Sequence, residues 1–411
     1  MRRLYLMFFV VLLAWIAVIS SGWSTAAYWP DADGYTSHVA EGRWVAHPPG
    51  YPFFVAVGHG FHALGLSPYQ SVQGASLALA VAGILGGFIL ANPYCGTKRA
   101  GILAAGLAFS WVTLLILQSG TSHAADLFTV TLLLITALKL PADHLPKPMN
   151  AIPTRADMGF AMAIVICAGF RFTTLVMMAP FFLCVAWFNR KRPAFWIACI
   201  TAGFAVMLLQ LWVIHMSGGY SSYSEYSRSM HEGNAFSSIV LKGITETSLF
   251  NIFRAFLWLG LGALPFLLIC LLNIRALSRK EIKPAVYGIA ASAGCLGVAS
   301  LYLCTHPGYI AAALPGFLLA AAVLWGNRQS AGMIFPIGAL IVGVGIYLAI
   351  KPFRPPENKL EALANGVFLQ YGAEASRNSL FRTTAAWLQE AGLVDEIPKN
   401  RQEDLELDGY R

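Results

Sequence analysis

Long apolar runs recur along almost the whole chain, and they constrain its fold more than any motif does. Each run approaches the roughly 20 residues that an α-helix needs to cross the hydrocarbon core of a bilayer. Because backbone polar groups cannot stay unpaired in lipid, such runs are expected to be helices. The composition agrees, since 57% of the 411 residues are hydrophobic and only 12% are charged. The sequence therefore predicts an all-α polytopic membrane protein.

About eleven membrane spans are expected from the lengths of these runs. The first, residues 1–19, begins with Arg2 and Arg3 and is interpreted as an uncleaved anchor rather than a signal peptide. Residues 53–66 are short and interrupted by glycine and histidine, so they are expected to lie along the membrane surface. The other spans are expected at 71–91, 101–117, 125–140, two within 158–188 with a turn at 169–172, 194–216, 250–274, 284–304, 308–325 and 332–350.

The basic residues indicate which way the chain is threaded through the membrane. Lys and Arg concentrate in the segments that this threading places inside, for example at 190–192 and 275–283. The net charge of +8 is therefore a topology signal, and no nucleic-acid partner is expected. With the N-terminus inside, residues 1–350 form a transmembrane domain with a first outer loop at 21–70. Residues 351–411 form a short polar tail outside.

The densest polar segment follows the first apolar run. It carries Asp31, Asp33 and Tyr35, and then the run His-Pro-Pro-Gly-Tyr-Pro at residues 47–52. Carboxylates at a membrane surface cost little free energy only if they face water or a polar cavity. The prolines exclude a regular helix and hold His47 on a stiff loop. From the residues alone, the alternatives are a solvated loop and a site.

This segment resembles the first outer loop of the GT-C superfamily of polytopic glycosyltransferases. The similarity is greatest to the protein O-mannosyltransferase and lipid A aminoarabinose transferase branch, and to the His-Pro-Pro-Gly-Tyr-Pro loop of O-mannosyltransferase-like proteins. The resemblance implies that the first aspartate of the loop, Asp31, is the catalytic base. Those families often have glutamate next, whereas Ala32 and then Asp33 follow here. The choice between Asp31 and Asp33 therefore stays open.

Other polar residues interrupt apolar runs at positions predicted on the same outer side. Tyr35 and His47 belong to the first loop, His123 and Asp126 begin the fourth span, Arg171 lies at the turn, and His306 closes the ninth span. Arg171 is the first candidate for a contact with a lipid phosphate, with snorkelling at the interface as its alternative. His306 is the second candidate. His123 and Asp126 share a helix face, where an interhelical hydrogen bond or a second acidic site is expected.

The resemblance implies an inverting transfer of a sugar from a polyprenyl-phosphate donor to a hydroxyl of a glycan, lipid or protein acceptor. The reaction would take place on the outer face of the membrane, in a bacterial inner membrane. The sequence indicates no definite cofactor, and two carboxylates with a histidine could hold a divalent cation. The seven cysteines lack zinc-ligand spacing. A transporter or flippase of lipid-linked saccharides is the alternative, and a structural membrane protein would not need the first loop. The long connector 217–247 is interpreted as a lid or acceptor groove, with a simple mobile connector as the alternative.

Overall fold

The structure is a computed structural model that describes residues 30–46, 48–141, 152–235, 239–244, 246–273, 281–301, 307–326 and 334–350. Every regular element among them is a helix, as the apolar runs predict. The helices are α2 Pro30–Ala40, α3 Pro52–Ala63, α4 Pro68–Ala108, α5 Trp111–Ile116, α6 Ala124–Leu138, α7 Arg155–Met177, α8 Ala179–Asn189, α9 Pro193–Met216, α10 Tyr220–Ala235, α11 Ile239–Lys242, α12 Glu246–Gly262, α13 Leu264–Asn273, α14 Ile282–Leu301, α15 Gly308–Ala311, α16 Leu314–Gly326 and α17 Ile334–Ile350.

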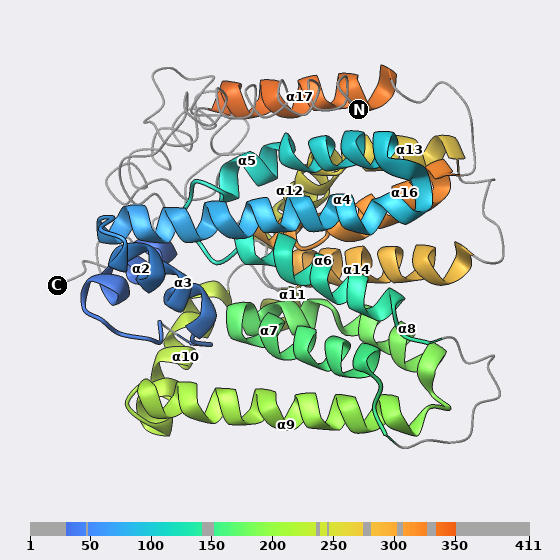
Figure 1. Cartoon of the computed structure of the whole chain (residues 1–411). Coiled ribbons are helices and arrows are strands. Elements are labelled where there is room, and N and C mark those ends of the chain that lie inside the picture. The colour runs from blue at the N-terminus through green and yellow to red at the C-terminus, as the bar shows by residue number, and fades with distance from the viewer. Residues whose placement is uncertain are drawn as a thin grey trace.

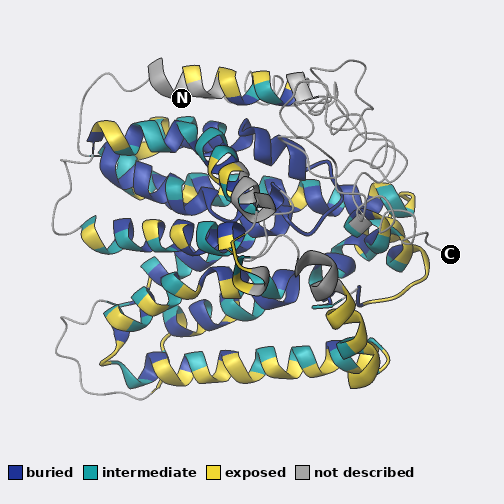
Figure 2. Cartoon of the chain, turned by 180° about the vertical axis from the view of Figure 1, so that it is seen from behind, coloured by how far each residue is buried: buried dark blue, intermediate teal, exposed yellow. Residues whose placement is uncertain are grey.

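Most of the long helices run side by side as a bundle (Figure 1). Helix α4 packs against α6 and α16, α14 packs against α16 and α8, and α7 packs against both α6 and α9. Helix α9 lies at one edge of the bundle and exposes most of its length (Figure 2). Exposed apolar residues on α9 include Ile200, Phe204 and Leu211. Because these side chains would be costly in water, this edge faces lipid in a membrane protein.

Five described helices are long and apolar enough to cross a membrane, and a sixth arises if α12 and α13 together form one bent span. The five are Pro68–Ala108, Arg155–Met177, Pro193–Met216, Ile282–Leu301 and Gly308–Gly326. The chain is thus an integral multi-pass membrane protein. The described residues contain five or six candidate spans, fewer than the eleven expected from the sequence. The expected first span at 1–19 and the polar tail at 351–411 lie outside the described residues.

The predicted position of the turn, at 169–172, was wrong. Helix α7 continues to Met177, and the chain instead turns at Met178, just before Pro180 in the first turn of α8. Pro180 has no N–H to continue the hydrogen bonds of α7 but is tolerated in the first turn of a helix, so a new helix begins here. Arg171 interrupts α7 only locally, with an extended backbone of φ −160° and ψ 98°. Gly169, two residues before Arg171, lies so close to Phe53 that a methyl group on Gly169 would clash with the Phe53 ring.

Among the other expected spans, one pair lies in α4 and two spans differ from the structure. The spans at 71–91 and 101–117 correspond to the two helical arms of α4, which meet at Gly96 with φ 76°, and the second arm leads into α5. A positive φ of this kind favours glycine. The arms lie against each other, since a Cβ at Gly87 would contact Leu107. The span at 125–140 is the 15-residue helix α6, which is shorter than a typical crossing. The span at 250–274 is broken into α12 and α13, which meet at 74°.

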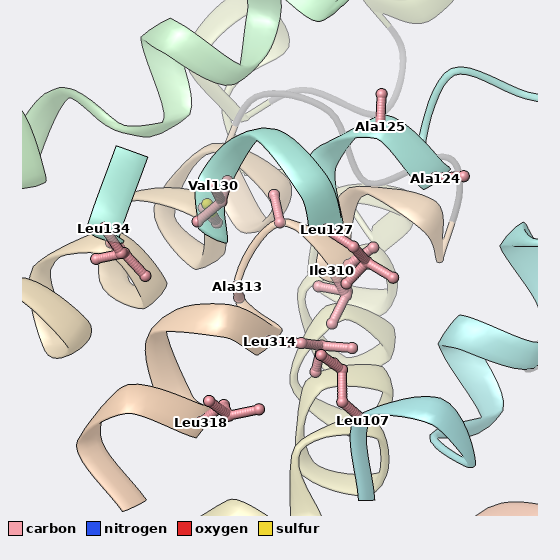
Figure 3. Close-up of a cluster of buried hydrophobic side chains, with 14 of the residues drawn as sticks. Leu107, Ala124, Ala125, Leu127, Val130, Leu134, Ile310, Ala313, Leu314 and Leu318 are labelled. Carbon is pink, nitrogen blue, oxygen red and sulfur yellow. The ribbon is translucent and has the colours of Figure 1, made fainter. Parts of the chain in front are cut away.

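Small residues set the closest helix contacts in the bundle. Gly288 of α14 and Gly316 of α16 face each other, and a Cβ on either would clash with the carbonyl oxygen of the other. In lipid, helix association depends on packing and hydrogen bonding rather than on the hydrophobic effect, so small residues that allow close approach are favoured. Leu127 of α6 belongs to the same buried hydrophobic cluster as Ile310 and Leu314 (Figure 3).

Gly294→Ala should destabilise the protein, whereas Gly297→Ala on the same helix should not. A Cβ at Gly294 would clash with the carbonyl oxygen of Met177 and with Pro180, while a Cβ at Gly297 meets nothing within 4 Å. Overpacking of this kind typically costs about 1–3 kcal/mol. Alanine at an open helix position gains about 0.5–1 kcal/mol over glycine. The unfolding temperatures of the two purified variants in one detergent test this difference, and equal temperatures would contradict the packing of α14 against α7 and α8.

Candidate active site

The two aspartates of the first loop lie in the first turn of α2. Helix α2 begins at Pro30, so the partial positive charge of the helix N-terminus lies beside Asp31 and Asp33. Asp31 is partly buried, whereas Asp33 is exposed. The two carboxylates therefore differ in environment, and Asp31 is the one that lies against the body of the protein.

An aromatic cluster anchors α2 to the loop that follows it. Tyr35 is fully buried, and its ring centroid lies 5.6 Å from that of Tyr51 and 4.9 Å from that of Phe54. The Tyr35 hydroxyl donates to Ser122 Oγ at 3.1 Å. Burial raises the pKa of both tyrosines, and the nearby negative charge of Asp31 raises both pKa values further. Both phenols therefore stay neutral, and Asp31 lies within electrostatic range of each.

The loop after α2 is held in a compact form. Ala46 N–H donates to the carbonyl of Gly50 at 2.9 Å, and Tyr51 adopts left-handed geometry with φ 49°. A side chain at Gly50, where φ is 112°, would clash with Val213 of α9, so the loop packs closely on that helix. The stiffness expected from the prolines is consistent with this geometry. His47 lies outside the described residues.

A buried polar segment, residues 117–123, lies beneath α2. It is irregular backbone between α5 and α6, and all of Gln118, Ser119, Thr121 and Ser122 are buried. Ser76 of α4 donates to the carbonyl of Thr121 at 3.1 Å. Irregular backbone at membrane depth is tolerated only where protein or a polar cavity surrounds it. No local signal marks this segment, because its residues directly continue an apolar run.

An ion pair joins α6 and α7 in the same region. Arg171 Nη1 donates to Asp126 Oδ2, and Thr174 Oγ1 donates to Asp126 Oδ1. Arg171 is 2% exposed and Asp126 is 0% exposed. Protein therefore encloses Arg171, which excludes the alternative of a snorkelling guanidinium. The interhelical hydrogen bond expected for Asp126 is present, and its partner is Arg171.

Two aromatic side chains cover this ion pair. The Arg171 guanidinium carbon lies 4.7 Å from the ring centroid of Tyr309 of α15. The His123 ring lies 4.8 Å from that of Tyr309 and packs edge to face against it. His123 Nδ1 is 3.9 Å from Asp126 Oδ2, which is beyond hydrogen-bond distance. Arg171 keeps further donors, because its buried Nε makes no hydrogen bond within the described part of the chain.

The aromatic cluster next to α2 and the ion pair between α6 and α7 come together at Tyr51. The charge of Arg171 lowers the pKa of Tyr51, although burial dominates and keeps it raised, and Tyr309 lies within the same electrostatic range. Four of the predicted site residues, namely Tyr35, His123, Asp126 and Arg171, thus lie near one another in the packed interior next to α2. Asp33 points to solvent, and His306 lies outside the described residues.

Sequence reasoning missed two tyrosines and a threonine. Tyr51 and Tyr309 end the similar runs His-Pro-Pro-Gly-Tyr and His-Pro-Gly-Tyr, and the structure brings these tyrosines together at Arg171. The similarity of these two runs could have indicated the tyrosines, but it was interpreted in terms of His47 and His306 instead. No comparable signal marks Thr174. Among the described residues no group of three His, Cys, Asp or Glu side chains could hold a metal ion.

No protein-family model and no curated protein matches the sequence. Among solved structures, the chain is similar to ArnT from Cupriavidus metallidurans bound to undecaprenyl phosphate, with a TM-score of 0.59 and 16% identity over 93% of this chain and 72% of that one. It is also similar to the same protein in the apo state, with a TM-score of 0.55 and 15% identity over 93% of this chain and 73% of that one. The chain therefore has an ArnT-like fold.

Proposed function

We propose that the protein is a membrane glycosyltransferase of the GT-C type that moves a sugar from a polyprenyl-phosphate donor to an acceptor hydroxyl. The observation that carries this proposal is the position of Asp31, which is partly buried and lies within electrostatic range of Tyr51, as Arg171 and Tyr309 do. The ArnT-like fold supports it, because one structure with that fold holds undecaprenyl phosphate.

Asp31 acts as the general base in this proposal. Its carboxylate removes the proton of the acceptor hydroxyl, and the oxygen attacks the anomeric carbon of the donor. The bond from that carbon to the phosphate oxygen breaks, so the configuration inverts and polyprenyl phosphate leaves with the electron pair. A base within hydrogen-bond reach of the reacting hydroxyl typically contributes about 10²–10⁴-fold to the rate. Asp33 is the alternative base.

Arg171 binds the phosphate of the donor in this proposal. Asp126 occupies its Nη1, and Thr174 holds the other oxygen of Asp126, so the guanidinium is fixed in one orientation. Its Nε has no hydrogen-bond partner in the described part of the chain and can donate to a phosphate oxygen. Charge-assisted donors that are fixed in advance stabilise a leaving phosphate best, since they need no reorganisation during the reaction. His306 and His47 are further candidates for donor contacts.

In this proposal the site lies on the outer face of the membrane, where nucleotide sugars are absent and a lipid-linked donor is needed. A bacterial inner membrane with the site on the periplasmic side is the proposed location. The positive-inside arrangement of basic residues supports this orientation, since 190–192, at the opposite end of α9 from α10, carry three of them.

Undecaprenyl phosphate should stabilise the purified protein, and undecaprenol should not do so to the same extent. A ligand that binds only the folded state contributes about 2.7 kcal/mol when its concentration is a hundred times Kd. The two lipids share the apolar chain, so the difference between them isolates the phosphate. The unfolding temperature in one detergent with each lipid tests this expectation. Equal shifts with the two lipids would contradict recognition of the phosphate.

A further inference from the structure

Helix α10 follows directly on the lipid-facing helix α9. The chain leaves α9 at Met216, turns through Gly218 and Gly219 with φ of 89° and 93°, and enters α10 at Tyr220 (Figure 1). Two consecutive residues with positive φ redirect the backbone sharply, and glycine adopts this geometry without strain. Because α9 is a candidate membrane span, α10 begins where that span reaches the membrane surface.

The residues of α10 separate into two faces. Tyr220, Tyr223 and Tyr226 recur every third position and cover an arc of about 120° at 3.6 residues per turn. On the opposite side of the helix lie Glu225 and Arg228. A helix with an apolar, aromatic face and a charged face is typical of segments that lie in the plane of a membrane interface.

The tyrosine face is only partly covered by the protein. Tyr220 is 74% exposed and Tyr226 is 49% exposed, while Tyr223 is partly buried. The exposed surface of α9 leads directly to it, since Trp212 and Met216 in the last turns of α9 are also exposed (Figure 2). The apolar surface is therefore continuous from a membrane span to the tyrosines of α10.

We propose that α10 is an interfacial helix whose tyrosine face inserts into the headgroup region of the lipid leaflet next to the site. Tyrosine and tryptophan are enriched at this depth because the ring is apolar and the polar atom at its edge reaches water. The occupant is the lipid bilayer, because the face continues a lipid-facing surface and the two charges on the opposite side are directed toward water. This inference does not depend on the proposed reaction.

Photo-crosslinking to lipid in the full-length protein tests the inference. The photoreactive amino acid p-benzoylphenylalanine is introduced at Tyr220 or Tyr226, and as matched controls at Ser221 or Glu225, which are exposed on the other face. Each variant is reconstituted in nanodiscs of phosphatidylethanolamine and phosphatidylglycerol, irradiated, and analysed by mass spectrometry. All four positions are exposed, so folding should tolerate each change. If one variant of a pair fails to fold, the other variant of that pair supplies the adduct yield for its face of the helix.

Lipid adducts are expected at Tyr220 and Tyr226. The adduct yield at Ser221 and Glu225 should be only a small part of that yield. Equal yields on the two faces would overturn the inference, since a helix in solution above the membrane contacts lipid on neither face preferentially. Crosslinks from the tyrosine positions to other segments of the same chain, in place of lipid, would also overturn it and would show that protein covers this face.

Discussion

Asp31→Asn should lower the rate of sugar transfer by at least ~10², the usual scale of general-base catalysis. The amide keeps the size of the side chain and its place in the first turn of α2, but it cannot accept a proton from the acceptor. Removing a negative charge near the N-terminus of α2 should cost only about 0.3–1 kcal/mol of stability, so the protein should still fold. Turnover of a purified, monodisperse variant with a polyprenyl-phosphate sugar donor measures the effect.

Asp33→Asn is the matched control, because it removes the same charge two residues away on the same helix turn. Asp33 is exposed and points away from the buried residues, so its variant should keep turnover near that of the wild type. Loss of activity in Asp33→Asn alone would move the base to Asp33. Normal turnover in both variants would sink the proposal that this loop supplies the base.

Arg171→Met should destabilise the protein strongly. The variant keeps the length of the side chain but leaves Asp126, which is fully buried, without its charged partner. Removing one partner of a buried ion pair typically costs about 3–5 kcal/mol. Arg171→Lys should recover part of this loss, since lysine supplies the charge without the planar fork of donors. Unfolding temperatures in one detergent measure the series.

A double variant separates the structural role of Arg171 from its proposed role in donor binding. Arg171→Met combined with Asp126→Asn removes both charges, so most of the stability lost in Arg171→Met should return. Stabilisation by undecaprenyl phosphate should remain absent in the double variant, because the phosphate contact is still missing. If the double variant responds to undecaprenyl phosphate as the wild type does, other groups hold the phosphate, and Arg171 serves only the packing of α6 against α7.

Hydropathy and local signals predicted the helices better than they predicted how these helices break. The span at 194–216 matches α9 closely, because a long apolar run has no other stable state in lipid. The turn expected around Arg171 failed for a physical reason, since the charge of this residue is matched within the protein core instead of by water. Its partner Asp126 lies 45 residues earlier in the sequence, and nothing local indicates that the two meet.

The candidate site shows the same contrast between local and distant information. Asp31, Asp33 and Tyr35 stood out because they are polar residues directly after an apolar run and resemble a known loop. The contact of Tyr35 with Ser122 spans 87 positions and depends on how α2 packs over the buried segment 117–123. Tyr51 and Tyr309 end two similar runs in the sequence, but only the fold shows that both lie at Arg171.

The pool of lipid-linked sugars in cells tests the central claim most directly. Mass spectrometry would compare polyprenyl-phosphate sugars in cells with the wild-type protein, without it, and with Asp31→Asn in its place. If the protein consumes such a donor, one polyprenyl-phosphate sugar should accumulate in the deletion and to the same extent in Asp31→Asn, and the wild-type protein should restore the original pool. An unchanged pool in both strains, with the variant present in the membrane at the wild-type level, would contradict a role as a polyprenyl-phosphate-dependent glycosyltransferase.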